Sequence, residues 1–490
     1  MLKLAAGIPA GRGTAPVDGH DDADASPHHI HGVVFGIGRG VSTVRSTSRV
    51  RRTPWSCSSS PQHARCPLFR APSSQSLEGG SAAYESFVRK HPGGRTTIEL
   101  AQASERPERL FLSSHLGSDL SKVERQARAL GLTVPERSAL YNRIHEAMRR
   151  VKQRHPLQSR IFKAWCMLAT VLTPAALAWL VLAPSAASVV CSTFWLMTYF
   201  MCVYHARWHK GARLYRTPWL NRLTFPLYQV LEHVWAIRPS LWRKKHNGSH
   251  HVYTNDMVLD YDVASVYPFL RHHHQQPRHA FHALQWLYAP LSFSMVTLLF
   301  PLYNFLEDRT YCRPVGQLTF AAWIGVNLGL PFALHGASGC LAVLVAYALT
   351  GLMLSYFFEV SHNHPSMEHG QSRAGEPVTT MGAPERGGMH AHGLVAGEGA
   401  AQRDLDGWIA MQLAESMSWG GYFATLYTGG LNLQVEHHLA PSQDPLYYHF
   451  FRREVQQICA EEGLPYNYEP TILHAVAKYH QHLYALGRHV

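Results

Sequence analysis

The sequence has few cysteines, and none of the eight is followed by a second one three positions later. Without a CxxC pair, a disulfide framework and a cysteine-ligated zinc site are both poorly supported, and reduced thiols in a protein that faces the cytosol fit better. A recognisable nucleic-acid-binding motif is also missing. The net charge of +12 therefore predicts contact with anionic lipid or an acidic partner rather than with nucleic acid. No signal peptide is evident.

The first eighty residues lack the apolar side chains that are needed to bury a core. They are rich in Ser, Arg, Gly, Pro and His, so we predict that residues 1–80 are disordered. The stretch RSTSRVRRTPWSCSSS resembles an organelle transit peptide, but four aspartates between positions 18 and 24 argue against one. An incorrectly predicted start site would explain the segment equally well, which leaves open whether the mature protein contains it.

Long apolar runs begin only after residue 160. Phe162–Ala183 and Ala186–Tyr204 each have about 20 residues, which matches the thickness of a bilayer, and Pro184 between them predicts a helical hairpin. Arg and Lys lie before the first run and after the second, so both outer ends should face the cytosol. We therefore predict an all-α, multi-pass integral membrane protein with His205 at the cytosolic surface.

Three more apolar runs follow, Leu284–Phe305, Phe320–Leu334 and Cys340–Val360. Three crossings would leave the C-terminal histidines on the opposite side of the membrane from His205, so we expect two. Leu284–Phe305 is the predicted interfacial or re-entrant piece, because two prolines interrupt it. The result is about four transmembrane helices with a cytosolic helical cap.

Histidines gather at three places on the predicted cytosolic side. Two stand four residues apart in HARWH, three lie in HNGSHH, and two follow a glutamine in QVEHH. Side chains at spacings of three and four share one face of a helix. Neutral imidazoles without carboxylate or thiolate partners suit iron held by nitrogen, so we predict a polyhistidine metal centre rather than chance pairs among the 33 histidines. The candidate ligands are His205, His209, His246, His250, His251, Gln434, His437 and His438.

These three boxes resemble those of the membrane-bound fatty acid desaturases, in particular the front-end group. The counterparts are HARWH at 205–209, HNGSHH at 246–251 followed by YTN, and QVEHHLAP at 434–441. Glutamine at the first position of the last box is the mark of that group. The first box departs from the pattern with Ala206 where Asp is common. This difference is expected to change the chemical properties of the metal centre more than its ability to bind metal. The resemblance runs from about residue 162 to the C-terminus.

The resemblance implies two non-haem iron ions, dioxygen as the oxidant, and a new double bond between an existing one and the carboxyl end of an acyl chain. His362, in SHN directly after the last apolar run, is a further candidate ligand. Asn247 and Glu436 are expected to orient ligand imidazoles by accepting their ring N–H bonds. Residues 161–490 are then a single desaturase domain.

A second resemblance lies upstream. His91 in FVRKHPGG and His115 in SSHLGSD resemble the haem-binding half of cytochrome b5, whose two histidines are axial iron ligands. The strands that normally precede the motif are not recognisable, and Ser114 replaces the usual Gly. We expect residues 81–120 to be a partial cytochrome b5-like segment, and the sequence leaves open whether it holds haem b. Residues 121–160 are expected to be a solvated helical linker.

The approach to the third box contains two further predicted segments. Ser366–Arg403 is Gly-rich and predicts a loop insertion, whereas Asp406–Thr428 predicts a helix that leads to the box. Gly429 and Gly430 then permit the turn that aims the box.

The resemblance also implies the partners and the alternatives. The partners are the lipid bilayer, an acyl-CoA or acyl-lipid substrate, and cytochrome b5 with its reductase if the fused segment is inactive. The endoplasmic reticulum is the expected membrane, with the plastid envelope as the alternative. Three other functions stay open: a sphingolipid long-chain-base desaturase, a lipid hydroxylase with the same two-iron centre, and a non-catalytic metal-binding relic.

Overall fold

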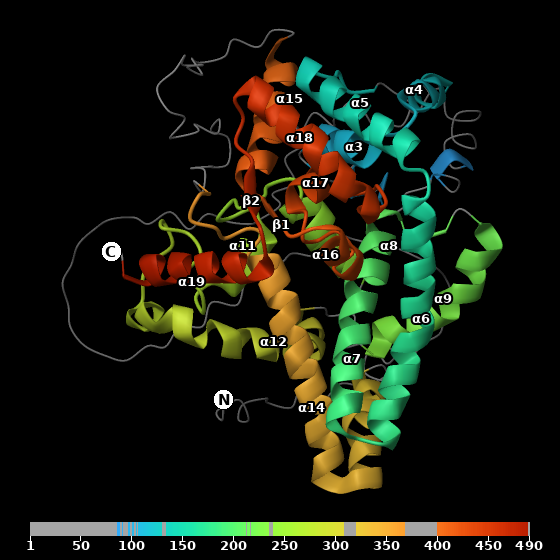
Figure 1. Cartoon of the computed structure of the whole chain (residues 1–490), viewed down its shortest axis with the longest axis vertical. Helices are drawn as coiled ribbons and strands as arrows, with labels where there is room; N and C mark the ends of the chain where they lie inside the picture. The colour runs from blue at the N-terminus through green and yellow to red at the C-terminus, as the bar shows by residue number, and fades with distance from the viewer. Residues whose placement is uncertain are drawn as a thin grey trace, which may run out of the picture. The chain divides into compact units, whose positions relative to one another are not determined.

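The computed structural model describes residues 106–129, 134–211, 213–215, 217–234, 239–307, 320–367 and 399–488, with short pieces between residues 86 and 104. The predicted disordered segment 1–80 and most of the predicted loop Ser366–Arg403 lie outside these residues. The described residues are almost entirely helical, as the sequence predicts (Figure 1). Their one sheet consists of two short parallel strands, β1 (Met417–Trp419) and β2 (Asn467–Glu469).

The first two apolar runs form the predicted helical hairpin. Helix α6 (Gln158–Leu182) ends just before Pro184, and α7 (Ala186–Thr198) begins just after it. Ser185 caps α7, because its side chain accepts a hydrogen bond from the backbone N–H of Ser188. Beyond α7 the helix continues as a π-helical segment, η2 (Tyr199–His205), and ends as α8 (Ala206–His209).

A second hairpin lies between residues 320 and 359. Helix α14 (Leu330–Glu359) follows the π-helical segment η6 (Gly325–Gly329) and is interrupted at Gly336, where φ is 62°. The two arms run back along each other: the Tyr347 hydroxyl donates to Asn327 Oδ1 at 2.8 Å, and Cys340 Sγ lies 3.3 Å from the carbonyl oxygen of Leu328. The two predicted crossings in this region are therefore the arms of one hairpin.

Helix α12 (Gln285–Glu307) lies across α14 in Figure 1 rather than alongside it. Its exposed side chains form an apolar stripe that includes Leu287, Leu291 and Leu302. Near its start it is bound to the C-terminal helix α19 (Ile472–Arg488), since Gln285 Nε2 donates to the carbonyl oxygen of Leu483 at 2.8 Å. The interfacial position of this helix stays a prediction, because Ala280–Leu302 is also long and apolar enough to cross a membrane.

By length and composition, four helical stretches among the described residues could cross a membrane: Gln158–Leu182, Ala186–His209, Ala280–Leu302 and Phe320–Glu359. The last stretch contains both arms of the second hairpin. Apolar helices of this number and length are those of a multi-pass membrane protein.

Helix α9 (Pro218–Val234) lies beside α6, and most of the remaining helices form a cap at the end of the hairpins where His205 lies (Figure 1). The other elements between the hairpins are α10 (Pro239–Lys245), the π-helical segment η3 (His246–His250), α11 (Tyr261–Val266) and the 3-10 helix η4 (Ala280–Leu284). After the second hairpin come α15 (Gly399–Ala414), α16 (Tyr422–Tyr427), α17 (Gln434–Leu439), the 3-10 helix η7 (Pro445–Tyr447) and α18 (Tyr448–Glu462).

The stretch before the first hairpin is helical, but it is not solvated all round as we expected. It contains α3 (Pro107–His115), α4 (Leu120–Ala129) and α5 (Ala139–Arg154). One face of α5 packs against α18, where Tyr141, Ile144 and Met148 are buried in a cluster with Phe451. The charged side chains of α5 lie outside this buried cluster, and Arg143, Arg150 and Arg154 form ion pairs with glutamates of α18. This high charge is why the composition of the stretch suggested a solvated linker.

The single helix predicted over Asp406–Thr428 is also wrong in one respect. Helix α15 ends at Ala414, and strand β1 separates it from α16. The strand pairs with residues 467–469, fifty positions later. A pairing partner so far away leaves no local signal in the sequence.

The buried face of α5 can be tested by stability measurements. Ile144 is 1% exposed, so Ile144→Ala should lower the free energy of unfolding by about 2–4 kcal/mol, as do other large-to-small changes in a core. Glu146→Ala, at an exposed site on the same helix, is the control and should change it little. Thermal unfolding in detergent would measure both, and equal values would mean that α5 is only a linker.

Candidate metal centre

The local structure of the first two histidine boxes departs from a regular α-helix, whereas the third box lies on the α-helix α17. His205 ends the π-helical segment η2, and His246 and His250 begin and end the π-helical segment η3. In η3 the backbone N–H of His251 donates to the carbonyl oxygen of His246 at 3.0 Å. The wider turn brings side chains five residues apart onto one face, which the α-helical spacing assumed from the sequence does not. His246 and His251 thereby come to face the same point.

The first of two histidine clusters joins the three boxes. The ligand atoms of His205, His209, His246 and His437 all lie within 4.8 Å of one another. The Nε2 atom of His246 lies 3.1 Å from that of His205 and 3.1 Å from that of His251. Nitrogen ligands about 2.1 Å from one metal ion lie about 3 Å apart, so these separations fit a shared ion.

The second cluster lies beside the first. The ligand atoms of His250, His362 and His438 also lie within 4.8 Å of one another. His251 is adjacent to both clusters, because its ring centroid is 4.7 Å from that of His437 and 4.4 Å from that of His438. The structure therefore brings together all eight histidines that the sequence singles out, as two neighbouring groups of imidazoles.

Hydrogen bonds fix the tautomers of the second cluster. The Nδ1–H groups donate to three different acceptors: His250 to Asp260 Oδ2 at 2.9 Å, His438 to Gln412 Oε1 at 2.7 Å, and His362 to the carbonyl oxygen of Glu415 at 3.1 Å. A neutral imidazole that donates from Nδ1 carries its lone pair on Nε2. The rings of His362 and His438 are thus prepared to donate an Nε2 lone pair to a metal ion, and His250 can do so when its Nε2 carries no proton.

Unpartnered nitrogens and lowered pKa values support metal binding. Nε2 of His437 and of His438 and Nδ1 of His251 are buried without a hydrogen-bond partner, which is costly unless a metal ion accepts the lone pair. Burial lowers the pKa of His246 and of these three histidines well below the usual value, so the rings stay neutral. Burial also lowers the pKa of His250, but the neighbouring carboxylate of Asp260 outweighs it and raises the pKa to about 9.

Comparison with known proteins gives the family. A sequence profile described as fatty acid desaturase matches residues 208–470, which is more than half of the chain. The chain belongs to the fatty acid desaturase family. The profile begins inside the first box, after His205, and so covers less of the chain than the resemblance that we traced from residue 162.

Curated relatives narrow the likeness to one kind of desaturase. The chain is 30% identical over 262 residues to the chloroplastic acyl-lipid (7-3)-desaturase of Chlamydomonas reinhardtii, covering 50% of this chain and 47% of that protein. It is 29% identical over 269 residues to the acyl-lipid (8-3)-desaturase of Physcomitrium patens, covering 50% of each. It is 25% identical over 273 residues to Delta(5) fatty acid desaturase A of Dictyostelium discoideum, covering 50% of this chain and 52% of that protein. The chain thus spans about half the length of these relatives, and no solved structure matches it.

The first box of this desaturase is anchored without the usual aspartate. Ala206 is buried, and the next residue, Arg207, forms a buried ion pair with Glu232 of α9. Trp208 Nε1 donates to the same carboxylate at 3.2 Å. The helix that carries His205 and His209 is therefore held by a neighbouring helix through Arg207 and Trp208.

The predicted supporting residues lie near the centre, but their hydrogen bonds go elsewhere. Glu436 accepts from the hydroxyls of Ser418 at 2.8 Å and Tyr466 at 2.6 Å, so it fixes α17 rather than a ring. Asn247 Nδ2 lies 3.4 Å from the carbonyl oxygen of Trp208. Gln434 is 1% exposed and lies beside His362. Burial lowers the pKa of His362 to about 3, and a hydrogen bond with the Gln434 amide opposes this shift.

The acceptors that do hold the rings were not found from the sequence. Asp260 lies ten residues beyond His250, and Gln412 and Glu415 lie far from the residues they hold. Asp260 also caps α11, and its side chain accepts from the backbone N–H of Asp262, which is the one local signal it gives. The other two contacts arise only from the tertiary structure.

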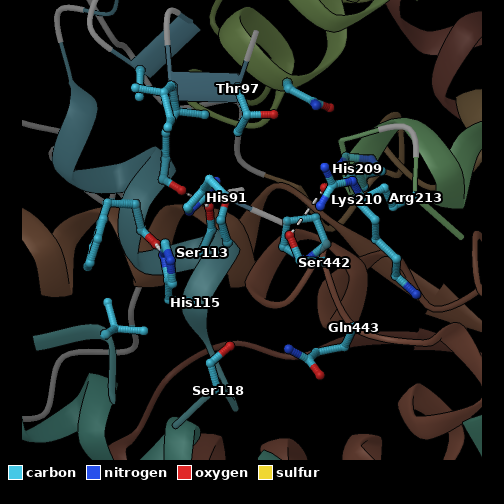
Figure 2. A pocket seen from close by; sticks show the side chains of 18 of the residues that line it. His91, Thr97, Ser113, His115, Ser118, His209, Lys210, Arg213, Ser442 and Gln443 are labelled. Carbon is cyan, nitrogen blue, oxygen red and sulfur yellow. Dashed lines mark hydrogen bonds between the residues drawn. The ribbon is translucent and has the colours of Figure 1, made fainter. Parts of the chain in front are cut away.

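The two histidines that resemble those of cytochrome b5, His91 and His115, lie close together on one side of a cavity of about 880 Å³ (Figure 2). The ring centroids of His91 and His115 are 6.1 Å apart, and His115 Nδ1–H donates to the carbonyl oxygen of Phe111 at 2.7 Å. Figure 2 places Lys210 and Arg213 on the opposite side of the cavity, next to the metal-centre residue His209. The segment packs on the desaturase domain, since Gln443 Nε2 donates to the carbonyl oxygen of Leu116 at 2.6 Å.

The role of Gln412 can be tested by metal retention. Gln412→Leu removes the acceptor that orients His438, and supporting changes of this kind weaken metal binding by about 10–100-fold. Gln412→Glu keeps an acceptor at the same place and should retain most of the affinity. Chelator competition on the purified protein would measure both, with Gln457→Leu at an exposed site as the control. Equal affinities for all three variants would rule out this role.

Proposed function

We propose that the chain is a front-end fatty acyl desaturase, which inserts a double bond into an unsaturated acyl chain with dioxygen and two electrons. The observation that carries this proposal is the meeting of eight histidines from three boxes and the SHN turn in two adjacent clusters. The Gln434-Val-Glu-His-His box and relatives named as Delta(5), (7-3) and (8-3) desaturases support the front-end assignment.

The donor set fits two non-haem iron ions. The first cluster offers four imidazoles and the adjacent His251, and the second offers three imidazoles with Gln434 beside them. When bound, the two ions would supply the oxidising power of dioxygen for removing one hydrogen from each of two neighbouring methylenes. A set of eight imidazoles with one amide oxygen beside them is suited to iron.

The chain's own residues make the site dry and rigid. Every candidate histidine ligand is buried, with at most 8% of its surface exposed. Trp242 stacks on His246 with ring centroids 4.4 Å apart and closes that side of the first cluster. Exclusion of water protects a strongly oxidising site from side reactions, while the hydrogen-bonded rings keep the ligand geometry fixed.

The electron source is the second part of the proposal. We propose that His91 and His115, whose ring centroids lie 6.1 Å apart, would hold haem b, which would supply electrons to the metal centre. Electrons would otherwise come from a separate cytochrome b5 and its reductase. The membrane is proposed to be the endoplasmic reticulum or the plastid envelope, and a relative with a chloroplastic name supports the latter.

Two rival activities make different products. A sphingolipid long-chain-base desaturase would act on the base rather than on the acyl chain, and a lipid hydroxylase with the same centre would stop at an alcohol. A non-catalytic relic would bind metal without either product. The clusters are common to all of these, whereas the QVEHH box favours acyl desaturation.

Loss of one ligand should abolish activity. His437→Ala removes a ligand of the first cluster, so desaturation should fall by more than the 10–100-fold that a supporting residue costs. A desaturase-null yeast that expresses the chain and is fed labelled polyunsaturated acids, with double-bond location in the products, measures it. His474→Ala, at an exposed histidine of α19, is the control. Full activity of the His437→Ala protein would refute the ligand assignment.

The haem has its own test. Purified protein reconstituted with haem should show a Soret band, and His91→Ala or His115→Ala should remove it because one axial ligand is lost. His155→Ala, at a histidine that stacks on Phe450 rather than lining the cavity, should keep the band. A wild-type protein without the band would assign electron delivery to a separate cytochrome b5.

A further inference from the structure

The backbone of Asn255 has a conformation that is unusual for a buried residue. Among the residues that the structure describes, it is the non-glycine residue with left-handed φ, at 61°. It is 4% exposed and lies four residues after His251. Asparagine tolerates this conformation better than most residues, but a left-handed residue in a buried site persists only where its contacts impose it.

Its side-chain amide joins two distant segments. Asn255 Nδ2 donates to the carbonyl oxygen of His362 at 2.8 Å and lies 3.0 Å from Glu415 Oε2. It also lies 3.3 Å from the carbonyl oxygen of Glu415, the atom that accepts the Nδ1–H of His362. The one amide thus contacts both the backbone of His362 and the group that orients its ring.

The backbone of Asn255 binds the carboxylate that orients a second histidine, His250. Its N–H donates to Asp260 Oδ2 at 2.8 Å, the oxygen that also accepts the Nδ1–H of His250. The preceding residue, Thr254, contacts the group that orients the third histidine of the cluster. Its Oγ1 donates to Gln412 Oε1 at 3.0 Å, the atom that also accepts the Nδ1–H of His438. Every ring of the second cluster is therefore oriented by a group that Thr254 or Asn255 contacts.

In the part of the chain that the structure describes, the rings of the first cluster are not oriented by groups that contact Thr254 or Asn255. Its rings meet one another through their Nε2 atoms, and Trp242 packs on them from outside. None of the hydrogen bonds described for Asn255 goes to a residue of that cluster. A change at Asn255 should therefore affect the two clusters unequally.

We propose that Asn255 is the positioning residue of the second histidine cluster, holding His362 through its amide and His250 through Asp260. This inference rests on the proposed function in one respect, that the clusters bind iron. It assigns a purpose to the asparagine that follows the second box, and it makes occupancy of the second cluster depend on a residue that touches no metal.

Two substitutions separate the amide from the backbone. Asn255→Gly keeps the left-handed conformation, because glycine adopts it freely, and removes only the amide. Asn255→Asp keeps the shape of the side chain but places a carboxylate against the oxygens of His362 and Glu415, where it cannot donate. The aspartate variant should therefore lose more of the second cluster than the glycine variant.

Iron content per chain measures the effect. We expect about two irons in the wild type and about one in Asn255→Gly, with the unfolding temperature little changed. His438→Ala should likewise retain about one iron, and adding Asn255→Gly to it should remove no more, because both changes act on the same cluster. Asn221→Asp, whose amide bonds to the carbonyl oxygen of Tyr215 at 2.6 Å, is the matched control and should keep two.

The outcomes distinguish this inference from the proposed function. Two irons in both Asn255 variants would overturn the positioning role while leaving the metal centre intact. Loss of both irons together, or further loss in the double variant, would also overturn it, since the role would then be one of general folding. If Asn255→Gly does not fold, iron content of the isosteric Asn255→Asp protein decides. A wild type that binds no iron would overturn the proposed function itself.

Discussion

The structure depends on holding eight buried imidazoles together away from water. Each ring is buried, so each of its nitrogens must find a partner or remain costly. In the second cluster the Nδ1–H groups have acceptors, and the ligand nitrogens of the three rings lie within 4.8 Å of one another. A cation bound between these nitrogens would accept their lone pairs together. A metal ion is therefore the partner that this buried arrangement fits.

That requirement determines how the chain crosses the membrane. The boxes are carried by η2, η3, α17 and the turn after α14, so these must all end at one level. Two helical hairpins achieve this, because each returns the chain to the side from which it started. Close packing then fixes the last box: a Cβ on Gly429 would lie 2.4 Å from the carbonyl oxygen of Met201 in η2, so only glycine lets the third box approach the first.

The sequence predicts the residues of this site whose spacing recurs along the chain, and it misses those that occur singly. Pairs such as His205 and His209 stand out because their spacing recurs, and the apolar runs place them at a membrane surface. Gln412, in contrast, is one polar residue in a helix and acquires its role only when α15 lies against α17. The same reasoning accounts for α5: its charges are visible in the sequence, but the partner that buries Ile144 is more than 300 residues away. Local pattern reveals which residues can bind a metal, and the fold decides which others hold them.

The segment before α5 is part of the same packed fold as the metal centre. Arg109 donates to the carbonyl oxygen of Val252, directly after the second box, and pairs with Asp404 of α15 at 3.0 Å. A Cβ on Gly248, within that box, would lie 2.9 Å from Leu100 Cδ1, so the segment also packs closely against η3. These contacts involve the elements that carry and support the ligands, and none of them needs a haem. Packing against the metal centre is therefore enough to explain why this segment is part of the fold.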